Sequence, residues 1–171
     1  MADRSVAGQQ EIWGETVDWL VKVGNVRTFL LKTGLEYNDL LVLLDLEFIN
    51  PANDIAILHL DESCDTAKKL IAVLDATKLD RIHRFLRLWR KLSGWKMWEL
   101  DLVIRVTALG NGSLDEPFLI TLFHFSRLRK RLGDKTTVEQ VCALLGDLNT
   151  TTHFTELHEK RADALYQNVF L

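Results

Sequence analysis

The sequence has few of the residues that define several large classes of protein. Only Cys64 and Cys142 are cysteines among 171 residues, and they lack C-x-x-C spacing, which excludes a disulfide framework. No apolar run approaches the roughly 18 residues of a membrane-spanning helix, so we expect no span in this segment. Residues 1–10 lack the basic and apolar regions of a secretory leader, so we expect no classical signal peptide.

Proline and glycine are also scarce, with two and nine residues, whereas leucine occupies 31 positions. This combination favours helices by propensity, and the 47% of apolar residues excludes intrinsic disorder. We therefore expect an all-α protein with a single domain over residues 1–171. Its expected architecture is an irregular stack of helical hairpins with about eight helices and at most one short extended segment near residues 55–60.

Apolar spacing, capping residues and breakers place the expected helices. The strongest pattern has Ile82, Phe85 and Trp89 at helical spacing. Ser113-x-x-Glu116 and Thr137-x-x-Gln140 are typical of capping boxes. The sequence predicts helices over about residues 12–23, 26–32, 36–47, 63–74, 79–92, 97–109, 114–132, 137–145 and 154–166.

One local pattern recurs along the chain. Gly34 and Gly94 each follow a helix, and an acidic residue with a leucine comes five and six residues later, as Asp39-Leu40 and Glu99-Leu100. Gly133 begins a looser third copy. The pattern predicts helix–turn–helix hairpins that share one core.

Charge is concentrated in two basic segments although the net charge is −3. An alternative function is therefore a helical module that binds protein, a polyanion or nucleic acid through Arg81–Lys91 and Arg127–Arg131, provided that both segments form one exposed surface. The second helix of each hairpin, however, carries acidic residues that would repel phosphate. We therefore do not expect nucleic acid as a partner.

Motifs for catalysis or cofactors are missing. His153 and His158 lie five residues apart, which is not the H-E-x-x-H spacing of a zinc site. An enzyme would need a pocket that joins these histidines with a carboxylate such as Glu156. We expect no enzyme, no cofactor and no metal.

Four separated segments together carry a family resemblance. Residues 79–95, continuing to Glu99-Leu-Asp101, resemble a segment of the large A-component of bacterial insecticidal toxin complexes. Gly34-Leu with Asp39-Leu40-Leu41, then Glu47–Pro51, and finally Leu165–Leu171 match in the same order, so the resemblance covers roughly residues 25–171. The motif residues are Phe48, Asn50, Pro51, Arg84, Phe85, Arg87, Leu88, Trp89, Arg90, Trp95, Leu100, Asp101, Tyr166 and Phe170.

The resemblance implies a structural role. In that family such segments belong to the α-helical shell of a very long subunit, and five subunits form a bell-shaped prepore around a channel that injects a toxic enzyme. It implies a non-enzymatic part of a larger toxin subunit, with other parts of that subunit or its sister subunits as partners in a homo-oligomer. It also implies secretion without a classical signal peptide.

The residue types suggest physical roles for the same motif. Phe85, Trp89 and Trp95 are large enough to anchor a core. Arg84, Arg87 and Arg90 are candidates for ion pairs with Asp80 and Asp101, which would set register more than stability.

Overall fold

The computed structural model describes residues 13, 19–133, 135–146, 148–150, 152–154 and 161–171. The all-α class is confirmed, because eight α-helices account for most of these residues. The helices are α2 (Trp19–Gly24), α3 (Val26–Thr33), α4 (Tyr37–Asp45), α5 (Ala76–Trp89), α6 (Met97–Arg105), α7 (Glu116–Leu132), α8 (Val138–Leu145) and α9 (Leu165–Phe170).

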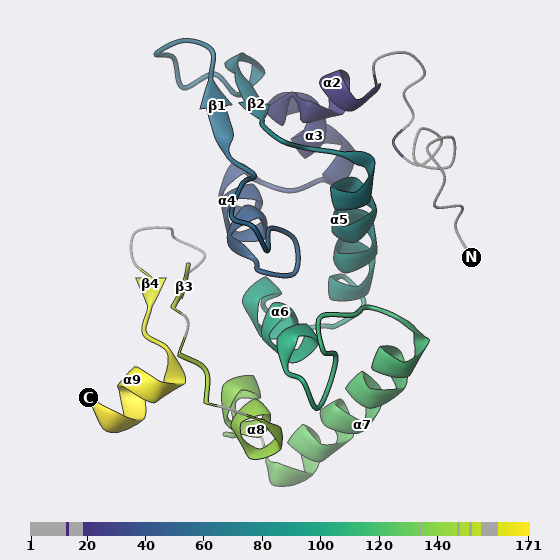
Figure 1. Cartoon of the computed structure of the whole chain (residues 1–171), viewed down its shortest axis with the longest axis vertical. Helices are drawn as coiled ribbons and strands as arrows, with labels where there is room; N and C mark the ends of the chain where they lie inside the picture. Colours follow the sequence, from purple (N-terminus) through teal and green to yellow (C-terminus); the bar gives the residue numbers. More distant parts are fainter. Residues whose placement is uncertain (1–12, 14–18, 134, 147, 151, 155–160) are drawn as a thin grey trace.

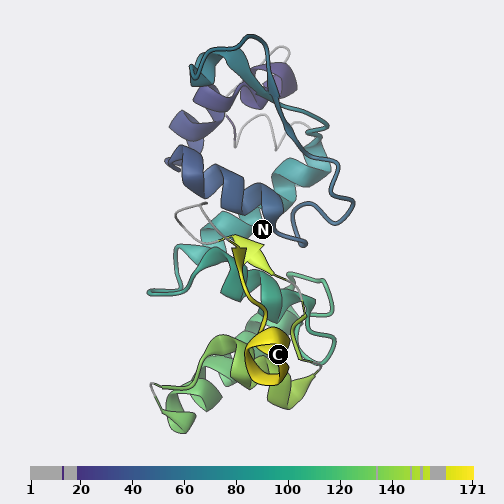
Figure 2. The same cartoon turned by 90° about the vertical axis from the view of Figure 1, so that its left-hand side faces the viewer.

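The helices stack along one long axis (Figures 1 and 2). Helices α2 and α3 lie at one end with strands β1 (Ile57–His59) and β2 (Lys69–Ile71), and α7 and α8 lie at the other end. Helices α4, α5 and α6 occupy the middle of the molecule. Strand β1 lies where the extended segment near residues 55–60 was expected.

The recurring glycine pattern has a clear structural basis. Gly34 and Gly94 both adopt positive φ values, of 64° and 77°, which residues with a Cβ rarely adopt. The acidic residue five positions later lies in the first turn of the next helix and accepts a hydrogen bond from the backbone N–H at the helix start. Asp39 accepts from Glu36 over 3.2 Å, and Glu99 accepts from Lys96 over 2.8 Å. The predicted glycine turn followed by a capped helix is confirmed at Gly34 and at Gly94.

Capping determines where the later helices begin. Helix α8 begins at the predicted Thr137–Gln140 capping box. The prediction that Ser113 caps α7 was wrong, because Asp115 accepts the hydrogen bond from the N–H of Phe118 at 3.0 Å. Asp is as good an N-cap as Ser, and α7 therefore begins at Glu116.

The helix predicted over residues 63–74 was wrong. This stretch forms a short 3₁₀ helix, η1 (Thr66–Lys68), and then strand β2. Strand β2 pairs antiparallel with β1, with Ile57 opposite Ile71. Asn25, at the start of α3, also donates from its side chain to the carbonyl of Ala67 at 2.8 Å. Non-local hydrogen bonds therefore outweigh the local helical pattern.

The helix predicted over residues 154–166 was also wrong in its described part. Strands β3 (His153–Phe154) and β4 (Arg161–Ala162) pair antiparallel there, and residues 155–160 lie outside the described residues. Helix α9 begins only at Leu165. Gln167 sets this start, because its side chain accepts the N–H of Ala164 at 3.0 Å.

A tight loop follows α6, and Gly110 is buried within it. A Cβ at this position would lie 2.3 Å from the carbonyl oxygen of Ile104, which already accepts the N–H of Gly112 at 2.8 Å. Because backbone atoms cannot yield as a flexible side chain can, we expect Gly110→Ala to lower the free energy of unfolding by about 2 kcal/mol. Urea denaturation measures this change.

Gly24→Ala is the matched control for this loop. Its added Cβ would lie 3.7 Å from the carbonyl of Ile71, an ordinary contact. We expect a change within about 1 kcal/mol for this variant. Equal stabilities of the two variants would contradict the packing described for Gly110.

Candidate functional site

The motif residues from the middle of the chain meet where the loop after α4 contacts α5 and α6. Asn50 is only 6% exposed and closes this loop with four hydrogen bonds. Its side-chain oxygen accepts the N–H groups of Asp54 and Ile55, at 2.9 and 3.1 Å. Its amide donates to the carbonyls of Leu44 and Ile55, at 3.0 and 3.2 Å. Both polar atoms of the Asn50 side chain thus form hydrogen bonds with backbone groups and fix the conformation of the loop.

Phe48 connects the same loop to both neighbouring helices. Its N–H donates to Asp101 of α6 at 2.8 Å. Its ring packs against the ring of Phe85 of α5, with centroids 6.2 Å apart. One residue therefore links the loop to an apolar contact on one side and to a carboxylate on the other.

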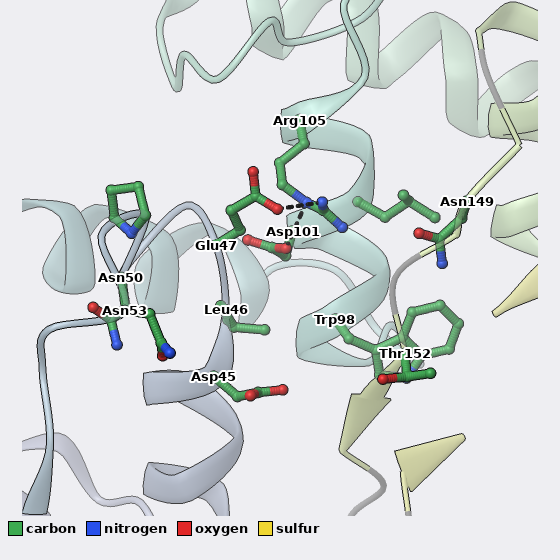
Figure 3. A pocket seen from close by; sticks show the side chains of 12 residues that line it. Asp45, Leu46, Glu47, Asn50, Asn53, Trp98, Asp101, Arg105, Asn149 and Thr152 are labelled. Carbon is green, nitrogen blue, oxygen red and sulfur yellow. Dashed lines mark hydrogen bonds and ion pairs between the residues drawn. The ribbon is translucent and has the colours of Figure 1, made fainter. Parts of the chain in front are cut away.

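Asp101 and Arg105 form the charged part of this junction (Figure 3). Arg105 lies 2.6 Å from the carboxylate of Glu47 and 2.9 Å from that of Asp101. The Nε of Arg105 makes an ion pair with Asp101 without the alignment of a hydrogen bond. Asp101 is only 4% exposed, and this burial raises its pKa to about 6, although Arg105 and the Phe48 N–H act in the opposite direction.

A cavity of about 320 Å³ opens beside this charged junction. Figure 3 shows Asp45 and Glu47 on one side and Trp98, Asn149 and Thr152 on the other. Both carboxylate oxygens of Asp101 are engaged by the protein itself, one by Phe48 and one by Arg105. The arrangement therefore resembles a structural polar network more than a reactive site.

Possible metal ligands do not gather in the described part of the chain, where no group of three His, Cys, Asp or Glu residues is arranged to hold a metal ion. Glu156 and His158 lie outside the described residues, and the side chain of His153 is not described either. The same described residues contain no helix long and apolar enough to cross a membrane.

The tryptophan-rich part of the motif closes the second hairpin. The indole N–H of Trp89 donates to the carbonyl of Trp95 at 2.8 Å. The ring of Trp95 packs against Phe125 of α7, with centroids 5.9 Å apart. Arg90 donates to the carbonyl of Thr33 at the end of α3. These contacts join the end of α5 to both α3 and α7.

The expected ion pairs form in part. Arg84 lies 3.8 Å from Asp80, one turn earlier on α5. Asp101 pairs with Arg105 instead of with a motif arginine, and the i,i+4 spacing of these two residues is the sequence signal that identifies the pair. Arg87 is exposed and does not belong to this junction.

The remaining motif residues are not brought into the junction. Pro51 and Tyr166 are exposed, as is Phe170, whose ring centroid lies 5.2 Å from that of Tyr166 on α9. Leu88 is half-buried against the core, and Leu100 is fully buried. The C-terminal segment therefore shares the sequence motif but not the junction.

The raised pKa of Asp101 predicts a pH-dependent stability. The folded state holds the Asp101 proton more tightly than the unfolded chain, whose pKa is about 3.8. The stabilisation by this proton is complete below about pH 4 and is lost as the pH rises through about 6. Asp101→Asn does not titrate. We expect the free energy of unfolding of the wild type, relative to this variant, to fall by on the order of 2 kcal/mol over this range.

Urea denaturation of both proteins across the range measures the difference. Because the other titrating groups are common to both, their contributions largely cancel. If the free energies of unfolding of the two proteins changed in parallel with pH, the pKa of Asp101 would be the same in the folded and unfolded states. That result would contradict the burial of its carboxyl group.

The fold and the junction together define an all-α chain with a buried polar network that holds backbone segments in place. No protein-family model, no curated protein and no solved structure matches the chain in comparisons with known proteins.

Proposed function

We propose that this chain is a non-enzymatic structural segment similar to the α-helical shell of the A-component of insecticidal toxin complexes. Its role would be to hold a helical wall in shape as part of a larger subunit. Its partners would be other parts of that subunit or sister subunits. The proposal rests on the resemblance of the sequence and on the way in which the motif residues are used.

The use of the motif residues carries this proposal. Asn50, Asp101 and Trp89 direct their polar atoms at the protein's own backbone, and Phe85 and Leu100 are fully buried. Asn50 and Asp101 also line the first cavity, but the protein itself already engages their polar atoms, whereas a catalytic or ligand-binding motif would offer such atoms to a ligand. These five motif residues therefore make internal contacts, as the residues of a structural segment would.

Exposed apolar side chains support a larger assembly. On α7, Leu119, Ile120 and Phe123 are all exposed, and Phe123 is 59% exposed. On α9, the exposed apolar residues include Tyr166, Val169 and Phe170. Large apolar side chains that gather on one helix favour burial against another protein surface. Neighbouring shell elements would provide that surface.

The size of the native protein tests the proposal. Antibodies raised against this chain are used to probe an extract of the source cells by denaturing gel and by gel filtration. We expect a polypeptide far larger than 19.7 kDa, in an oligomer. A native 19.7-kDa protein that elutes as a monomer would contradict the structural-segment proposal.

The alternative of a polyanion-binding module has one observation in its favour. Arg129 of α7 lies over the ring of Trp95, with its guanidinium carbon 5.7 Å from the ring centroid, so the second basic segment contacts the turn that follows the first. Fluorescence anisotropy with a DNA duplex over a range of salt concentrations distinguishes the two functions. Tight binding at physiological salt that weakens steeply with added salt would favour the alternative. A structural segment should show no such binding.

A further inference from the structure

A second cavity, of about 430 Å³, lies between the end of α3 and the second half of α5. Its lining includes Lys32 and Thr33 from α3, His83 and Arg87 from α5, and Arg90 directly after α5. This volume falls in the range of pockets that hold small organic ligands. The cavity uses none of the residues of the junction around Asp101.

The charge of the lining is positive. His83, Arg87 and Arg90 follow one another at spacings of four and three residues, so they share one face of α5. Arg87 is exposed, and Arg90 is fixed in part by its hydrogen bond to the carbonyl of Thr33. Burial and the charge of Arg87 lower the pKa of His83, although Asp80 acts in the opposite direction. The two arginines therefore supply the positive charge that this face of the cavity presents.

Trp13 contributes an apolar ring surface and a buried indole N–H group to the cavity. It lines the cavity, is only 6% exposed, and stacks on Phe29 with ring centroids 5.7 Å apart. Its indole N–H is buried and has no hydrogen-bond partner among the described residues. A buried donor without a partner is costly and is commonly satisfied by a ligand or water. Leu86 completes the apolar part of the lining.

We propose that this cavity binds a small organic phosphate through Arg87 and Arg90. Guanidinium groups present parallel N–H donors that match phosphate oxygens, and such charge-assisted hydrogen bonds are the strong ones. Trp13 and Leu86 would contact the organic part of the ligand. This open cavity is smaller than the extended basic surface of a polyanion-binding module, and the proposal does not depend on the proposed structural function.

Isothermal titration calorimetry with AMP as the probe tests this proposal. Inorganic phosphate and adenosine serve as probes for the two halves of the ligand. We expect AMP to bind with a 1:1 stoichiometry, inorganic phosphate to bind more weakly, and adenosine not to bind measurably. We expect Arg87→Ala to weaken AMP binding by at least about 10-fold, since it removes a charge-assisted contact.

Arg81→Ala is the matched control, because Arg81 lies on the same helix and does not line the cavity. We expect its affinity for AMP to remain within about 2-fold of the wild type. No binding of AMP at millimolar concentration would overturn the proposal, as would equal losses in both variants. A DNA duplex that binds in place of AMP and loses affinity equally in both variants would also overturn it, in favour of an extended polyanion surface.

Discussion

Phe85→Ala is expected to lower the free energy of unfolding by about 4 kcal/mol, the largest loss among the variants considered for this chain. Phe85 is fully buried on α5, and its ring packs against that of Phe48. Truncation removes this contact and leaves a cavity where the loop after α4 meets α5. Because backbone hydrogen bonds hold both elements, they cannot close completely around the missing ring. Urea denaturation followed by far-UV circular dichroism measures the loss.

Phe123→Ala provides the matched control for this prediction. Phe123 is the same residue type on another long helix, α7, but it is largely exposed. We expect its truncation to change the free energy of unfolding by no more than about 0.5 kcal/mol. If both phenylalanine variants lost the same amount, Phe85 would not occupy the centre of the packing described above.

Asn50→Ala is expected to lower the free energy of unfolding by about 3 kcal/mol. The substitution leaves the buried N–H of Ile55 and the carbonyl of Leu44 without their partner. A buried group that loses its partner retains the full cost of desolvation. The loss therefore exceeds what one hydrogen bond contributes. Equilibrium denaturation gives the magnitude, and hydrogen exchange at Ile55 shows whether the loop itself has opened.

Asn168→Ala is the control for a single exposed asparagine contact. Asn168 donates one hydrogen bond to the carbonyl of Asp163, at 3.2 Å on the surface. We expect a loss of no more than about 0.5 kcal/mol. A comparably small loss for Asn50→Ala, with unchanged exchange at Ile55, would mean that water replaces Asn50 and that the loop does not need it.

The sequence predicted those parts of the fold that depend on local interactions. Gly34 and Gly94, each with an acidic residue five positions later, predicted the two hairpins because turn, cap and buried leucine all lie within seven residues. The same holds for the box of Thr137 and Gln140 at the start of α8. Such signals are local hydrogen bonds and backbone preferences, so a short stretch of sequence contains all the information that they need.

The errors arose where distant contacts decide the structure. Residues 69–71 are compatible with a helix by apolar spacing, but pairing with β1 and contacts with α3 make them a strand. Likewise, Asp101 was expected to pair with an arginine of α5, and the fold pairs it with Arg105 of its own helix. The strand does not follow from local propensity, because it depends on which elements pack together. The Asp101–Arg105 pair was missed although its i,i+4 spacing is a local signal.

In the candidate site, too, the local features were predictable and the non-local contacts were not. The sequence predicted a helix over about residues 36–47, and α4 ends at Asp45, shortly before Asn50. The four hydrogen bonds of Asn50 and the link from Phe48 to Asp101 were not predictable, because they need the three-dimensional positions of Ile55 and α6. The cavity beside Lys32 and Arg87 could not be predicted from the sequence either, because these two residues are about fifty positions apart.

Energetic coupling across Phe48 is the most direct test of the central claim that the motif residues of the junction, Phe48, Phe85 and Asp101, act together as one structural unit. A double-mutant cycle at pH 7 combines Phe85→Leu with Asp101→Ala, which remove the apolar and the polar partner of Phe48. A parallel cycle combines Asp101→Ala with Phe29→Leu, since Phe29 is equally buried but stacks on Trp13. We expect a coupling energy of about 1 kcal/mol in the first cycle and additivity within about 0.3 kcal/mol in the second. Additive losses in the first cycle would contradict the claim.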